Sequence, residues 1–169
     1  MQPRIDYGKV DPAAVRTLLG VEQYVHHCGL EESLLDLVKI RASQINGCAY
    51  CLDMHTIDAR VSGETEQRLF NLDVWREAPF YSDRERAALA WAEAVTLLTE
   101  GHVPDEVYEQ VQQQFSEQEI VSLTMAIIAI NGWNRINVSM RTLPGNYRSQ
   151  RKPRPVLSTV SETPGMRDN

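Results

Sequence analysis

The most informative stretch of the chain is residues 34–55, which read LLDLVKIRASQINGCAYCLDMH. The apolar side chains of its first half recur at the spacing of one helical face: Leu34, Leu37, Val38 and Ile45. Asn46-Gly47 is a strong signal for a helix end and a tight turn. A second helix is expected to start at about Cys48. The stretch therefore predicts two consecutive helices, with a cysteine at the start of the second.

The helical pattern extends outward from this stretch in both directions. Capping signals and apolar spacing predict helices at about 12–28, 31–45, 48–61, 64–75, 82–99, 104–115 and 116–141. No segment shows the pattern of a strand, and from Pro144 onward prolines, serines and basic residues replace the apolar spacing. We predict an all-α, single-domain bundle of about six to seven helices over residues 1–143 and an irregular C-terminal tail over 144–169.

Length and charge narrow the classes of function. A chain of 169 residues suits one domain, and a net charge of −6 argues against a nucleic-acid partner. No run reaches the roughly 18 apolar residues of a membrane span, and the N-terminus lacks the apolar region of a signal peptide. We expect a cytoplasmic protein without a membrane partner. In that reducing compartment a Cys-x-x-Cys pair is more often catalytic or metal-binding than structural.

The strongest candidate site consists of Cys48, Cys51 and His55. At about 100° per residue, a helix starting at Cys48 places Cys51 about 60° and His55 about 20° from it around the axis, so all three share one face. Cys51 and His55 are neighbours four residues apart, and the cysteines are one turn apart, close enough for a disulfide. A helix N-terminus and a nearby histidine both favour the reactive thiolate. This arrangement suits a dithiol that reacts with an oxidant and closes to a disulfide.

Two other interpretations of these residues remain open. Free cysteines also occur as small buried hydrophobic residues. The two cysteines and His55 could instead bind zinc, although structural zinc usually takes four ligands, and the fourth would have to come from the run His26-His27-Cys28. No haem, flavin or nicotinamide motif is visible. We therefore expect neither a cofactor nor a metal.

At this point the sequence resembles a known family. Residues 34–55 resemble the core motif of the AhpD-like alkylhydroperoxidases, which belong to the carboxymuconolactone decarboxylase superfamily, and Asn131-Gly-Trp-Asn-Arg135 resembles a second stretch common in that group. The resemblance implies an all-α fold, a homo-oligomer that is often a trimer or hexamer, and reduction of a small peroxide by the cysteine pair. It also implies an external dithiol or disulfide reductase as electron donor. The apolar run Met125 to Ile130 independently suggests a surface covered by another subunit.

The resemblance also suggests a fourth site residue. The family has a glutamate twelve residues before the first cysteine, which forms a proton relay with the histidine, and the matching position here is Asp36, one methylene shorter. The resemblance and the proximity of His55 favour Cys51 as the thiol that attacks peroxide, with Cys48 resolving and meeting the reductant. The helix dipole favours Cys48 as the more acidic thiol. One rival function is a redox-sensing oligomeric stress-response protein that uses the same cysteine pair. The other is decarboxylase-like chemistry, which does not need the cysteines.

Overall fold

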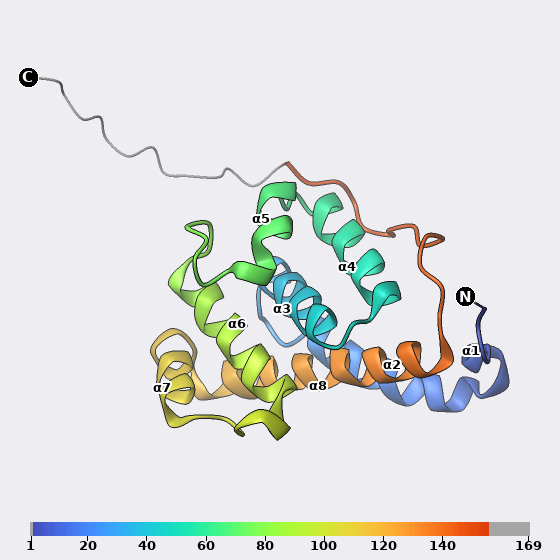
Figure 1. Cartoon of the computed structure of the whole chain (residues 1–169), viewed down its shortest axis with the longest axis horizontal. Helices are drawn as coiled ribbons and strands as arrows, with labels where there is room; N and C mark the ends of the chain where they lie inside the picture. Colours follow the sequence, from blue (N-terminus) through green and yellow to red (C-terminus); the bar gives the residue numbers. More distant parts are fainter. Residues whose placement is uncertain (1, 156–169) are drawn as a thin grey trace, which may run out of the picture.

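The computed structural model describes residues 2–155, and within them every regular element is a helix (Figure 1). The elements in chain order are α1 (Tyr7–Val10), α2 (Pro12–His26), α3 (Glu32–Ile45), α4 (Ala49–Val61), α5 (Glu66–Asn71), η1 (Leu72–Val74), α6 (Asp83–Thr96), η2 (Leu98–Glu100), α7 (Asp105–Gln114) and α8 (Glu117–Met140). The predicted all-α fold is confirmed. None of the described helices is long and apolar enough to cross a membrane.

The number of helices differs slightly from the prediction of six to seven. The described residues contain eight α-helices, and the additional one is α1, a single turn whose first backbone groups are capped by Asp6. Four residues are too few to show helical periodicity, so the sequence pattern could not reveal it. The helix expected over 64–75 is divided into α5 and the 3₁₀ turn η1. Capping boxes are present at Ser82 before α6 and at Ser116 before α8, where the helices predicted over 82–99 and 116–141 begin.

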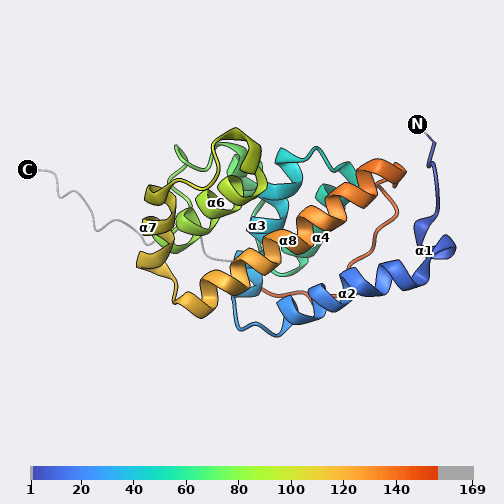
Figure 2. The same ribbon diagram turned by 90° about the horizontal axis from the view of Figure 1, so that it is seen from below.

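Helix α3 forms the centre of the bundle and packs against α4, α6 and α8. Its side chains are buried on most of its circumference, and Leu37, Val38, Ile40 and Ala42 are at most 1% exposed. Helix α8, the longest, runs beside α2 along one side of the molecule (Figure 2). This packing places the start of α4, which carries the cysteines, between α3 and α8.

The chain beyond α8 crosses back over α4 as an irregular segment, residues 142–155, which we call the strap (Figure 1). The Tyr147 hydroxyl of the strap donates to the Asp58 carboxylate of α4 and lies 2.9 Å from both of its oxygens. The remainder of the predicted tail, 156–169, lies outside the described residues. The division of the chain at residue 143 therefore stays a prediction.

Candidate active site

Cys48 and Cys51 form a disulfide at the start of α4, with their Cα atoms 5.3 Å apart. Gly47 precedes the pair with a φ of +64°, a left-handed conformation in which a side chain would be strained. Cys48 is the N-cap of α4, and its Sγ accepts a hydrogen bond from the backbone N–H of Cys51 at 3.3 Å. The tight turn and the cap therefore place both sulfur atoms at the positive end of the helix dipole.

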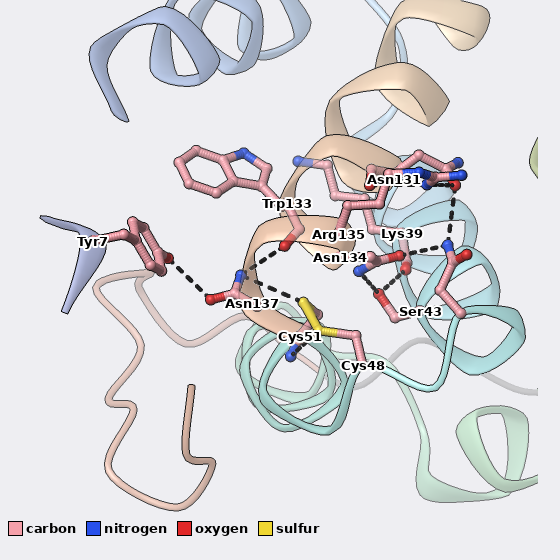
Figure 3. The surroundings of a disulfide bond; sticks show 11 residues. Tyr7, Lys39, Ser43, Cys48, Cys51, Asn131, Trp133, Asn134, Arg135 and Asn137 are labelled. Carbon is pink, nitrogen blue, oxygen red and sulfur yellow. Dashed lines mark hydrogen bonds between the residues drawn. A yellow bond between two sulfur atoms is a disulfide. The ribbon is translucent and has the colours of Figure 1, made fainter. Parts of the chain in front are cut away.

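Helix α8 covers the disulfide, and both cysteines are at most 1% exposed. The side-chain amide of Asn137 donates to Cys51 Sγ at 3.7 Å and to the Trp133 carbonyl at 2.9 Å. The hydroxyl of Tyr7, from α1, donates to Asn137 Oδ1 at 2.9 Å (Figure 3). Sequence reasoning missed Asn137 and Tyr7. A usable signal was the spacing of Asn131, Asn134 and Asn137, three amides on one side of a largely apolar helix.

The other two of these amides hold the turn that precedes the cysteines. Asn46 Nδ2 donates to Asn131 Oδ1 at 3.0 Å and to Asn134 Oδ1 at 2.9 Å. Asn134 Nδ2 in turn donates to Ser43 Oγ at 3.0 Å. A buried amide is costly unless it is paired, and the buried Asn134 is paired with Asn46 and Ser43. The network fixes the α3–α4 turn against α8 and so sets where Cys48 lies.

His55 lies on α4 as predicted, and it is 6% exposed. Its Nδ1 is buried without a hydrogen-bond partner among the described residues. Burial, assisted by the charges of Lys39 and Arg151, lowers the pKa of His55 to about 3. The imidazole is therefore neutral at physiological pH, a form that can accept a proton.

Asp36 is a buried residue of α3, 2% exposed, whose carboxylate is paired with Arg151 of the strap. Arg151 Nη1 donates to Oδ2 at 2.5 Å and Nη2 to Oδ1 at 2.8 Å, so both oxygens are occupied. Burial raises the pKa of Asp36 above its ordinary value, and the Arg151 guanidinium opposes that rise. Within residues 2–155, Asp36 makes no hydrogen bond to His55. Sequence reasoning missed Arg151 because the tail around it has no periodic pattern.

A cavity of about 470 Å³ opens beside His55 and Asn137. Four of its lining residues are aromatic: Tyr7, Tyr50, Trp133 and Tyr147. Asp36 lines a separate cavity of about 240 Å³, and Lys39 and Arg151 line both cavities. These two cations therefore form a shared wall between Asp36 and the cavity at His55. In the part of the chain that the structure describes, no group of three or more His, Cys, Asp and Glu side chains is placed to hold a metal ion.

The fold agrees with the comparison to known families. The model of the carboxymuconolactone decarboxylase family matches residues 12–94, and the chain belongs to this family. Its fold is AhpD-like. Over 140 residues the chain is 43% identical to the uncharacterized protein YdfG of Bacillus subtilis (strain 168). The matched region covers 83% of this chain and 95% of that protein.

Two solved structures extend the comparison. One is a protein of unknown function from Agrobacterium tumefaciens, proposed to be the antioxidant defence protein AhpD. It is 44% identical with a TM-score of 0.84, and the match covers 86% of this chain and all of that one. The other is an uncharacterized peroxidase-related protein from Ralstonia eutropha JMP134, with 18% identity, a TM-score of 0.69 and coverage of 82% and 74%. At this identity the second match supports the fold alone.

Proposed function

We propose that this protein is a thiol-dependent peroxidase that reduces peroxides through a dithiol–disulfide cycle of Cys48 and Cys51. The observation that carries the proposal is the disulfide at the N-terminus of α4, whose Cys51 Sγ contacts Asn137, a residue that lines the cavity at His55. Both the helix start and the neighbouring donors favour a thiolate. The similarity to an AhpD candidate at 44% identity supports the peroxide as oxidant.

The cycle balances with a peroxide and an external dithiol. The Cys51 thiolate attacks the terminal peroxide oxygen, an S–O bond forms, the O–O bond breaks, and the alkoxide takes a proton to leave as an alcohol. Cys48 then attacks the sulfenic acid sulfur, the S–O bond breaks, and hydroxide takes the Cys48 proton to leave as water. The external dithiol transfers two electrons and two protons by thiol–disulfide exchange and becomes a disulfide itself.

His55 serves as the proton acceptor for Cys51 in this proposal. The imidazole is neutral before the reaction, so it has a free site for the thiol proton. Its low pKa disfavours the protonated form, so this proton must pass on to the leaving alkoxide. Asp36 acts together with Arg151, because both carboxylate oxygens already bind the guanidinium. Its influence on His55 is therefore electrostatic: the carboxylate offsets the charge of Arg151, which would otherwise disfavour a protonated His55 more strongly.

The assembly and the partners form part of the proposal. We expect a homotrimer or homohexamer in the cytoplasm, reduced by an external dithiol or a disulfide reductase. Three apolar side chains on α8 are about half exposed, which supports a subunit contact there: Val121, Ile128 and Val138. Both cysteines are buried, so exchange with a partner thiol requires a local opening around the start of α4.

A peroxide assay with several dithiol reductants tests the proposal. We expect turnover in the wild type, its loss in Cys51→Ser and in Cys48→Ser, and its retention in Cys28→Ser. Cys28 is the matched control because it is the third cysteine and takes no part in the disulfide. An activity of the decarboxylase type that survives removal of both Cys48 and Cys51 would contradict the proposal. Reversible oxidation without turnover would favour the redox-sensing alternative instead.

A further inference from the structure

Within residues 2–155, Asn137 is the residue outside α4 whose side chain forms a hydrogen bond to the sulfur of Cys51. It lies on α8, 86 residues away in sequence, and it is 4% exposed. Its Nδ2 is 3.7 Å from Cys51 Sγ, a distance within reach of a hydrogen bond to sulfur (Figure 3). The contact leaves open which end of the amide faces the sulfur, because the oxygen and nitrogen of an amide are assigned from their surroundings.

The surroundings of Asn137 fix the orientation of its amide. One end of the amide lies 2.9 Å from the carbonyl oxygen of Trp133, which can only accept, so that end must be the NH₂ group. The other end lies 2.9 Å from the hydroxyl of Tyr7, which donates to the amide oxygen. One NH₂ hydrogen is used by Trp133, and the second points toward Cys51 Sγ. The amide therefore donates to the sulfur, and the bond from Tyr7 to the amide oxygen stabilises this orientation.

A hydrogen-bond donor at this sulfur acts differently in the two redox states. A disulfide sulfur is a weak acceptor, whereas a thiolate is charged and accepts much more strongly. The bond from Asn137 therefore strengthens when the pair is reduced, and it favours the thiolate over the neutral thiol. Cys48 has its own donor, the backbone N–H of Cys51 at the start of α4. Each sulfur is thus served by a separate donor.

We infer that Asn137 is a further catalytic residue, which stabilises the Cys51 thiolate through its side-chain NH₂, and that Tyr7 is the positioning residue which orients the amide. The inference rests on the proposed redox role of the cysteine pair, but it does not depend on peroxide being the oxidant. It assigns the direct stabilisation of Cys51 to α8 and α1, while His55 takes the proton.

Alkylation of the reduced protein tests the inference. The rate at Cys51 is followed by mass spectrometry as a function of pH in a Cys48→Ser background, for the parent, Asn137→Ala and Tyr7→Phe. A bond to a charged group is worth enough to move the midpoint of this profile up by about one pH unit in Asn137→Ala. We expect a smaller upward shift in Tyr7→Phe, which keeps the amide and its bond to Trp133 but loses the hydroxyl that binds the amide oxygen. In the protein with both cysteines, Asn137→Ala should shift the redox equilibrium about tenfold toward the disulfide, or about 30 mV.

Ser122→Ala is the matched control. Ser122 is a buried polar residue of the same helix, and its hydroxyl bonds to that of Tyr24 and not to a sulfur. It should lower stability and leave the alkylation midpoint unchanged. An unchanged midpoint in Asn137→Ala, or an equal shift in Ser122→Ala, overturns the inference. If Asn137→Ala does not fold, Tyr7→Phe decides alone, and an unchanged midpoint there overturns it.

Failure of the proposed function is distinguishable from failure of this inference. Alkylation and redox equilibration involve no peroxide, so a shifted midpoint in a protein that reduces no peroxide supports the inference and contradicts the peroxidase. A wild-type peroxidase whose midpoint does not respond to Asn137 or Tyr7 gives the opposite result.

Discussion

Replacing Arg151 by methionine removes the guanidinium that binds Asp36 and leaves a buried carboxylate without a partner. The side chain of Asp36 is 3% exposed and that of Arg151 is 20% exposed. Breaking a fully buried ion pair by removing one partner costs about 3–5 kcal/mol. Because Arg151 is partly exposed and water can enter where it lay, we expect Arg151→Met to lower the free energy of unfolding by about 2–3 kcal/mol at neutral pH.

The pH dependence of this loss follows from the pKa of Asp36. Burial already raises that pKa in the folded wild type, and removal of Arg151 raises it further because the guanidinium opposed the rise. A carboxyl group whose folded pKa is raised loses stability as the pH rises through that pKa. The difference between Arg151→Met and the wild type should therefore be largest at neutral pH. It should shrink as the pH falls and vanish below 3.8, the ordinary pKa, where the carboxyl is protonated in both folded and unfolded chains.

Urea unfolding with the disulfide intact measures the effect, and a double-mutant cycle assigns it. Asp36→Asn combined with Arg151→Met should be more stable than Arg151→Met alone, since the buried carboxylate that Arg151 bound is then neutral. Arg148→Met is the control on the same strap, because the Arg148 guanidinium bonds only to the carbonyl of its neighbour Tyr147 within the described residues. Equal losses in the two arginine variants, or a loss from Arg151→Met that persists unchanged in acid, would refute the reasoning.

Four further predictions concern the site and the assembly. The pKa of His55 is about 3 in the folded chain and 6.5 in the unfolded one, so wild-type stability should fall as the pH drops from 6.5 toward 3, and His55→Ala should flatten that decline in acid unfolding curves. His55→Ala should also slow peroxide turnover by at least about tenfold, and an unchanged rate with an intact fold would exclude His55 as the proton acceptor. Mass spectrometry after mild peroxide should find Cys48 linked to Cys51 with Cys28 free, whereas a dominant Cys28 linkage would contradict the site. Light scattering should give a trimer or hexamer, and a stable monomer at micromolar concentration would contradict the assembly.

Much of the fold and half of the site could be predicted from local sequence. Helix caps, apolar spacing and the Asn46-Gly47 turn depend on a few neighbouring residues, so they can be recognised in the sequence without knowledge of the tertiary packing. For the same reason the sequence placed Cys48, Cys51 and His55 on one side of α4. The disulfide links residues only three positions apart, a distance that helix geometry fixes by itself.

Tertiary packing alone decided what surrounds these residues. Asn137 meets Cys51 across 86 residues, and Arg151 meets Asp36 across 115. The family resemblance suggested Asp36 as the relay partner of His55. In the folded chain, Arg151 of the strap binds both of its carboxylate oxygens. Local patterns determine which face of a helix is apolar, and they carry no information about which distant donor is brought to a buried charge or sulfur. That choice depends on the packing of α8 and the strap against α3 and α4, because a buried polar group must find a partner among the segments that the fold places beside it.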